Sequence, residues 1–282
     1  MPSMKAIKRR ITSVKNTQQI MKAMNLVAAS KLQKNKNKLE VVRPFFEEAK
    51  HFLAHTAPRI EAEESPFYTT REAKRSAYVV ITGERGLCGS YNANVLKEAL
   101  NHMEGKNEKI ISVGAKGKEY FVRRRKHIHE EHLGVMDRVS YPEASAIGEA
   151  LGAMFNATDE AERVDEVFVA YTRFETILSH EPCVVQLLPF TSVRDSAVGV
   201  EIYEPDVETY LRKAVPIYMS MFIYGAMVES ATCGEASRMT SMDAAARNAG
   251  EILEDITLEY NRKRQSAITQ EINEIVSGAN AL

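Results

Sequence analysis

Acidic residues are missing from the first 39 positions of this chain. Those positions hold ten basic residues, whereas the full 282-residue sequence has a net charge of -1. The bases are Lys5, Lys8, Arg9, Arg10, Lys15, Lys22, Lys31, Lys34, Lys36 and Lys38. Because the chain as a whole is not basic, its charge does not indicate a nucleic-acid binder. Bases without acids on one helix repel one another, so the run favours a surface for an acidic partner over a plain solvated face.

Long apolar runs and paired cysteines are scarce as well. No run approaches the roughly 20 residues that cross a bilayer, and the N-terminus lacks the apolar core of a signal peptide. The three cysteines, Cys88, Cys183 and Cys233, lie far apart and form no C-x-x-C pair. An odd number without metal spacing predicts reduced thiols in the cytosol, most simply as small buried or incidental residues.

A phosphate-binding glycine pattern is absent where an α/β fold would place one. Gly83–Tyr91 follows an expected strand and precedes an expected helix, but its glycines are spaced G-x-x-G-x-x-G. The dinucleotide motif needs G-x-G-x-x-G and the P-loop needs G-x-x-x-x-G-K-[ST]. Gly114–Lys118 fails the same test. We therefore expect a tight strand-to-helix turn that packs the helix on the sheet, and no bound nucleotide or other cofactor.

Metal-binding and catalytic motifs are missing too. His127, His129 and His132 alternate along the chain, but no carboxylate or thiol set completes a zinc-type site around them. With the basic run Arg123–Lys126 just before them, a solvated basic loop is the expected structure. No nucleophile elbow or Ser/His/Asp signature is present. We therefore expect no catalytic residue and no metal site.

The chain does have a regular apolar seam through its first 53 residues. Alternating steps of four and three from Ile7 to Leu53 predict a coiled-coil helix over about Ser3–His55. Pro44 is expected to kink or bend this helix. Three amides in the seam should fix its register at some cost in stability. The fourteen seam positions are Ile7, Ile11, Val14, Gln18, Met21, Asn25, Ala28, Leu32, Asn35, Leu39, Val42, Phe46, Ala49 and Leu53.

The middle of the chain, from about residue 76 to 205, changes period. Short β-rich runs at Ala77–Thr82, Lys109–Val113, Val167–Tyr171 and Cys183–Leu188 alternate with expected helices at 92–103, 116–125 and 143–156. This alternation predicts a small Rossmann-like α/β domain with a largely parallel sheet. Because only a short polar segment joins the last two runs, we expect them to form an antiparallel hairpin at one edge.

Helical spacing returns from about residue 206 to the end. Pro216 is expected to interrupt the start of this helix, which should pair antiparallel with the first one. The predicted fold is α+β or α/β: a long antiparallel coiled coil of the two terminal helices (1–57 and 206–282) with an inserted α/β domain (75–205). The C-terminal helix is the longer one. Its last part, with Ile268, Ile272 and Ile275 on one face, should project without a partner in the chain and be buried by another protein.

Both ends of the sequence resemble one family. Ser13–Ile20 (SVKNTQQI) and Lys22–Leu32 (KAMNLVAASKL) resemble the opening of the γ subunit of F-type ATP synthases. Tyr260–Ala279 (YNRKRQSAITQEINEIVSGA) resembles that family's C-terminal signature. Gly83–Asn92 resembles its glycine loop, and Arg238-Met239 is a further match.

The resemblance implies a rotor shaft, present once per complex, that turns inside a hexamer of α and β subunits. The α/β domain would contact the ε subunit and the c-ring, and the chain itself would do no chemistry and bind no nucleic acid. It would lie peripherally on the cytoplasmic face of a bacterial membrane, a bacterial origin being favoured by the lack of a transit peptide. By motif, Lys22 and Met24 should face the acidic lever of β. The full set of implied hexamer contacts is Lys22, Met24, Glu235, Arg238, Arg264, Gln265 and Thr269.

Two other functions stay open on the residues alone. A nucleotide-binding enzyme carried by the middle domain predicts saturable binding of ATP by the isolated chain. A basic coiled-coil protein that binds nucleic acid predicts steeply salt-dependent binding of DNA.

Overall fold

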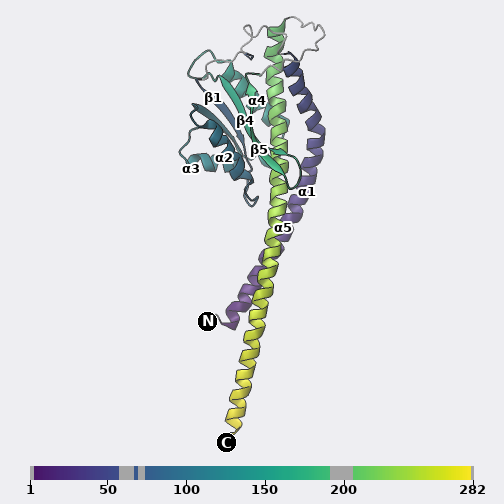
Figure 1. Ribbon diagram of the computed structural model, residues 1–282, viewed down its shortest axis with the longest axis vertical. Helices are drawn as coiled ribbons and strands as arrows, with labels where there is room; N and C mark the ends of the chain where they lie inside the picture. Colours follow the sequence, from purple (N-terminus) through teal and green to yellow (C-terminus); the bar gives the residue numbers. More distant parts are fainter. Residues whose placement is uncertain (1–2, 57–66, 69–73, 191–205, 281–282) are drawn as a thin grey trace. The chain divides into compact units, whose positions relative to one another are not determined.

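The computed structural model describes residues 3–56, 67–68, 74–190 and 206–280 (Figure 1). The chain divides into two compact units. Met1–Ala29 and Arg238–Leu282 form the first, the paired-helix unit, and Ser30–Ser237 form the second, the sheet unit. The first and last helices each contribute to both units.

The first helix, α1, spans Met4–Thr56 and confirms the predicted N-terminal helix. Ser3 caps it, since the Ser3 hydroxyl oxygen accepts a hydrogen bond from the Ala6 N–H at 3.3 Å. The helix runs through Pro44.

Burial along α1 follows the predicted seam. Ile7, Ala28, Leu32 and Leu39 are at most 5% exposed. The other described seam residues are half-buried, and most residues between them are exposed. The side chains of the last three seam positions, Phe46, Ala49 and Leu53, lie outside the described residues.

The last helix, α5, spans Val207–Asn280 without a break. The expected interruption at Pro216 is therefore wrong. Proline in a helix interior costs about 3 kcal/mol, but Leu211, Val215 and Met219 on the same turns are completely buried in the core. Their packing outweighs the proline penalty.

One stretch of α5 is apolar enough, by length and composition, to cross a membrane, with a mean hydropathy of 1.2. This corrects the expectation that no apolar stretch approaches that length. Of this stretch, 67% is buried inside the protein. The core helix of a soluble protein passes the same test, so the stretch is weak evidence for a membrane span.

A five-stranded sheet forms the centre of the sheet unit, with strand order β3-β2-β1-β4-β5. The neighbours β3, β2, β1 and β4 pair in parallel, and β4 pairs with β5 in antiparallel fashion. The predicted parallel sheet and edge hairpin are both confirmed. In chain order the elements are β1 Ser76–Ile81, α2 Tyr91–Met103, β2 Glu108–Val113, α3 Ala115–Arg123, β3 Ile128–His132, the 3-10 helix Val135–Asp137, α4 Tyr141–Phe155, β4 Glu166–Phe174 and β5 His180–Leu188.

Strand β3 replaces the expected solvated loop around the three histidines. Ile128, Glu130 and His132 are half-buried, whereas His129 and Glu131 between them are exposed. This is the period-two burial of a strand with one face against the protein. Charged side chains are common on edge strands because they oppose pairing with other chains. Because β3 is mostly charged, its sequence does not show the apolar pattern by which a strand is predicted.

The two faces of the sheet are covered by different helices. On one face, Tyr78 and Val80 of β1 pack with residues of α2 and α3 such as Val95 and Phe121. On the other face, β1 residues such as Val79 pack with α4 and with the first turns of α5. Every residue of β1 is buried, as expected for a central strand covered on both faces. The start of α5 is thereby part of the domain core.

Candidate functional site

Two amides join α1 to α5 in the paired-helix unit. The side-chain N–H of Gln18 donates to the Ala246 carbonyl at 3.1 Å, and that of Asn25 donates to the Met239 carbonyl at 2.8 Å. The second bond lies seven residues later on α1 and seven earlier on α5. The helices therefore run antiparallel with a fixed register, and two of the three predicted seam amides bond across it.

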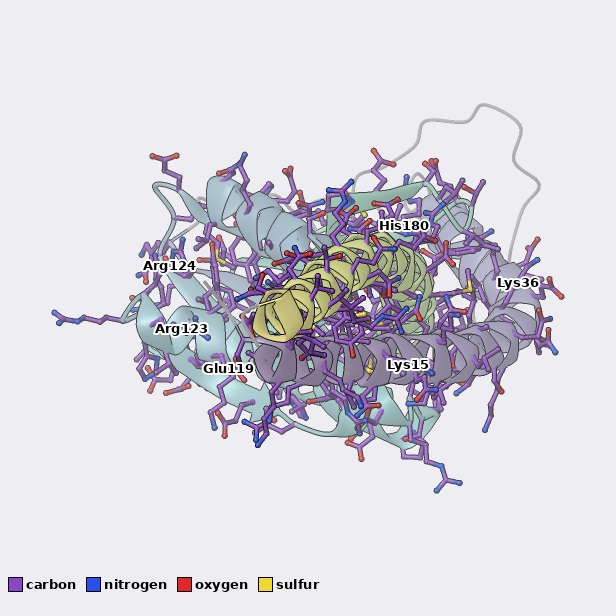
Figure 2. The ribbon with its side chains drawn as sticks, turned by 90° about the horizontal axis from the view of Figure 1, so that it is seen from below. Lys15, Lys36, Glu119, Arg123, Arg124 and His180 are labelled. Carbon is purple, nitrogen blue, oxygen red and sulfur yellow. The ribbon has the colours of Figure 1, made fainter. Side chains whose placement is uncertain are left out.

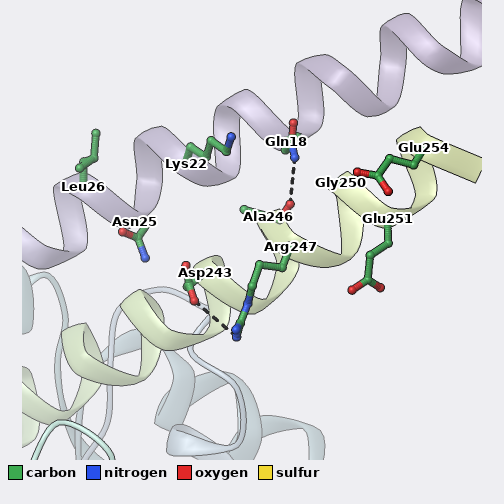
Figure 3. A pocket seen from close by; sticks show the side chains of 10 residues that line it. All are labelled: Gln18, Lys22, Asn25, Leu26, Asp243, Ala246, Arg247, Gly250, Glu251 and Glu254. Carbon is green, nitrogen blue, oxygen red and sulfur yellow. Dashed lines mark hydrogen bonds and ion pairs between the residues drawn. The ribbon is translucent and has the colours of Figure 1, made fainter. Parts of the chain in front are cut away.

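A groove lies beside these bonds (Figure 3). It has a volume of about 590 Å³. Arg247 and Asp243 form an ion pair within α5 at 3.4 Å. The lining residues are Gln18, Lys22, Asn25, Leu26, Asp243, Ala246, Arg247, Gly250, Glu251 and Glu254. Most of the lining residues carry a charge or an amide, and the groove is open to solvent.

The end of α5 extends beyond the start of α1. By the register of the two amide bonds, Met4 lies opposite Tyr260, so residues 261–280 continue for roughly 30 Å without α1 beside them. Figure 1 shows α5 passing the N-terminus of α1 in this way. Ile268, Ile272 and Ile275 are 47%, 53% and 71% exposed. The expected projecting helix with an unburied apolar face is present.

Three of the predicted contact residues lie on this projecting segment. Arg264, Gln265 and Thr269 are exposed and fall within two helical turns. The Thr269 hydroxyl donates to the Gln265 carbonyl at 2.9 Å, inside the helix. All three side chains are therefore on a surface that a surrounding protein can reach.

The other four predicted contact residues are less uniform. Lys22 is exposed and lines the groove, while Met24 and Arg238 are half-buried. The Glu235 side chain is 13% exposed and lies 3.9 Å from Lys31, which is 43% exposed. The Glu235 side chain is therefore mostly buried beside a basic residue of α1.

Sequence reasoning missed an apolar component on the outer face of α1. Ile20, Leu26 and Val27 are 59%, 71% and 58% exposed. All three are apolar residues outside the seven-residue seam. Their position outside the seam could have identified them as exposed apolar residues. The surface beside Lys22 and Met24 is therefore mixed apolar and basic, not purely basic.

The glycine loop after β1 is closed by its own side chains. The Glu84 carboxylate accepts hydrogen bonds from the Ala115 N–H at 3.0 Å and from the Met136 N–H at 3.2 Å. The Thr82 hydroxyl oxygen accepts one from the Gly117 N–H at 2.8 Å. Helix N-termini bind phosphate through such amides, and Glu84 occupies that position at the start of α3. The turn from β1 into α2, expected from the glycine spacing to be tight, is held by the Asn92 side-chain oxygen, which accepts a hydrogen bond from the Gly83 N–H at 2.8 Å.

The basic run at the end of α3 is partly paired. The Arg123 guanidinium lies 3.3 Å from Glu119, and Arg124 lies 3.8 Å from the centre of the Tyr120 ring. Figure 2 shows Glu119, Arg123 and Arg124 at this end of the domain. Within the described residues, no group of three or more His, Cys, Asp or Glu side chains is arranged to hold a metal ion.

None of the three cysteines forms a disulfide with another described residue. Cys88 and Cys233 are buried and Cys183 is half-buried. Burial raises the pKa of the Cys233 thiol, and burial likewise raises the pKa of Cys183. A thiol nucleophile needs a lowered pKa, so the environment of both residues favours a structural role.

The family model described as ATP synthase matches residues 3–282 of the chain. The ATP synthase gamma chain of Halothermothrix orenii is 41% identical over 290 residues, covering all of both chains. A gamma chain of Acetobacterium woodii, named as sodium ion specific, is 36% identical and covers 98% of this chain and 97% of its own length.

Solved structures agree with these relatives. The central stalk and c-ring structure of the Tetrahymena thermophila mitochondrial ATP synthase contains a chain 26% identical, with a TM-score of 0.61, covering 80% of this chain and 99% of that one. A chain of the Euglena gracilis mitochondrial ATP synthase has the same fold, with a TM-score of 0.73 at 19% identity. The match covers 99% of this chain and 94% of the Euglena chain. From the family model and the full-length relatives, this chain belongs to the ATP synthase γ-chain family.

Proposed function

We propose that this chain is the central rotor shaft of an F-type ATP synthase. It turns inside a hexamer of α and β subunits and couples ion flow through the c-ring to ATP synthesis or hydrolysis at the β subunits. Central stalk and c-ring are the parts named for the similar Tetrahymena chain. The observation that carries the proposal is the projecting end of α5, whose isoleucines are 47–71% exposed on a helix that extends beyond the start of α1.

The paired-helix unit supplies the surface that meets the hexamer. We propose that Lys22 and Met24 face the β lever, and that Arg264, Gln265 and Thr269 meet the loops of the ring that surround the projecting helix. Arg238 contacts the ring beside them, and Glu235 contributes through its position behind Lys31. Where the ring meets polar and basic groups of the shaft, these contacts can exchange neighbours as the shaft turns, because they are individually weak in water.

The sheet unit is the part that the ε subunit and the c-ring hold. We propose three functional parts. Residues 1–57 and residues 206–282 are the two helices of the coiled-coil shaft, and residues 75–205 are the attachment domain. The chain is a non-catalytic subunit, and its complex lies on the cytoplasmic face of a bacterial membrane. At the start of α3 the Glu84 carboxylate occupies the position where a phosphate would bind, and this supports a mechanical role over a nucleotide site at that turn.

Reconstitution with α and β subunits tests this proposal. The chain is mixed with purified α and β subunits, and the complex is isolated and assayed for ATP hydrolysis. The full chain should co-purify in a ratio of one per hexamer and raise turnover. A chain lacking Ile268–Leu282 should be retained less well while its sheet, measured by circular dichroism, is unchanged. A full chain that neither joins the hexamer nor raises turnover would contradict the proposal.

A further inference from the structure

The guanidinium of Arg43 joins three elements of the sheet unit: α1, which carries it, and α5 and β4, to which it donates hydrogen bonds. Arg43 of α1 donates from Nη2 to the Glu229 carboxylate of α5 at 2.7 Å and to the Phe174 carbonyl at 2.8 Å. Phe174 is the last residue of β4. Arg43 immediately precedes Pro44, where α1 lacks a backbone N–H. The helix is therefore fixed by a side chain at the point where its own hydrogen-bond ladder is interrupted.

Glu229 depends on this partner. Its side chain is 6% exposed, whereas that of Arg43 is 44% exposed. The second carboxylate oxygen, Oε2, has no hydrogen-bond partner within the described residues. A buried carboxylate that loses its cation is left as an uncompensated charge, which is strongly unfavourable. Separation of the Arg43–Glu229 ion pair is therefore opposed by the free-energy cost of leaving the Glu229 carboxylate buried without a cation.

The neighbouring turn of α5 is bonded to the sheet and to α2. The Thr172 N–H of β4 donates to the Ser230 hydroxyl oxygen at 3.1 Å, and the Tyr91 hydroxyl of α2 donates to the Ser230 carbonyl at 2.8 Å. The Cys233 thiol lies 3.5 Å from the Thr172 carbonyl. Residues 229–233 of α5 are therefore fixed to the domain by directional bonds, and Arg43 adds α1 to the same place.

The remaining contacts of α1 in this unit are different in kind. Leu32 and Leu39 of the seam are buried by apolar packing, which is non-directional and resists separation more than sliding. Lys38 reaches the Val139 carbonyl at 2.5 Å and lies 5.1 Å from the Tyr224 ring, through a flexible stem. Arg43 uses a rigid planar group to make two charge-assisted bonds at once.

We propose that the Arg43–Glu229–Phe174 contact is a torque clamp, which makes α1, α5 and the sheet turn as one body. This inference rests on the proposed rotor function. Arg43 and Glu229 act here as positioning residues. Without the clamp, α1 slides along the seam under load, and part of each rotation is absorbed as twist within the shaft.

The test replaces the ion pair by methionines in the complete synthase. Arg43→Met alone should lower the melting temperature, because Glu229 is left buried and charged. The double variant R43M/E229M should recover the melting temperature, because paired apolar side chains of similar length often replace a buried ion pair without loss. The matched control is K118M/E131M, which removes an exposed pair of 2.7 Å that joins α3 to β3.

Two readouts separate torque from stability. With the hexamer immobilised, the angular spread of a probe on α3 is recorded, and in membrane vesicles the ions pumped per ATP hydrolysed are measured. We expect R43M/E229M to show a wider spread and a loss of pumped ions per ATP at a normal melting temperature, with the control unchanged. A double variant that matches wild type in both readouts overturns the clamp. Failure of the wild-type chain to turn in the hexamer would instead refute the rotor function.

Discussion

Gln18 of α1 donates a hydrogen bond to the main-chain carbonyl of Ala246 on α5 at 3.1 Å, and Gly250 leaves the space for it. A Cβ at position 250 would lie 3.0 Å from the Gln18 amide nitrogen. The acceptor is a backbone group four residues before the glycine, on the same face of the helix. The register of the helix pair is therefore set by a bond to the backbone, and Gly250 leaves room for the Gln18 amide that makes this bond.

Gly250→Ala should leave stability unchanged or raise it slightly. Alanine favours the helix by about 1 kcal/mol, and the atom in the way is the end of a flexible side chain. Gly148→Ala should instead lower the free energy of unfolding by about 1–3 kcal/mol, because its Cβ would lie 2.9 Å from the backbone nitrogen of Ser220. Urea unfolding of both variants checks this, and a reversed order of stability would contradict the packing described.

Asn25→Ala should weaken the helix pair by about 1 kcal/mol, the net value of one hydrogen bond. Asn25 is half-buried and donates to the Met239 carbonyl at 2.8 Å. Asn16→Ala is the control, since Asn16 is exposed on the same helix. Thermal melting followed by circular dichroism measures both. Equal changes for the two variants would show that the cross-helix bond adds nothing to stability.

Glu84→Ala should lower the free energy of unfolding by about 0.5–2 kcal/mol, as the loss of a helix cap does. The carboxylate holds the N–H groups of Ala115 and Met136. Glu98→Ala, an exposed change on α2, is the control. Isothermal titration with ATP should show no saturable binding to the wild-type chain. Tight binding of ATP would refute the structural interpretation of the loop.

The stability of the sheet unit should carry a pH dependence from Glu229. Burial raises the pKa of Glu229 in the folded protein, and the Arg43 guanidinium opposes this shift. A raised acid pKa stabilises the fold below the unfolded value of about 4.3; that stability is lost as pH rises through the folded pKa. Relative to Glu229→Gln, wild type should therefore lose unfolding free energy as pH increases above this value. Urea titrations at several pH values measure the unfolding free energy of both proteins. A wild type that gains unfolding free energy relative to Glu229→Gln as pH rises would contradict this prediction.

The terminal helices could be predicted because their periodicity is long and regular. Every described seam position from Ile7 to Val42 is buried or half-buried, since a seven-residue repeat leaves one way to pack a helix pair. The parallel strands were recognisable for a related reason: a strand such as β1, buried on both faces, is apolar throughout. Local composition carries both signals.

The elements that sequence reasoning missed depend on tertiary contacts. Pro216 signals a break, but the buried neighbours of α5 override it. Strand β3 is charged because it lies at a sheet edge, which no local pattern reveals. Arg43 and Glu229 are 186 residues apart in the chain. In the sequence Arg43 is one more base on a basic helix, and only the fold turns it toward a carboxylate.

Rotation of this chain inside a hexamer of α and β subunits is the most direct test of its function. The hexamer is fixed to a surface, a visible probe is attached to α3 of the sheet unit, and ATP is added under a microscope. The rotor function predicts rotation in one direction that stops when ATP is removed, and loss of sustained rotation when Ile268 and Ile272 are both changed to Asp. ATP hydrolysis by the complete complex with a stationary probe would contradict it.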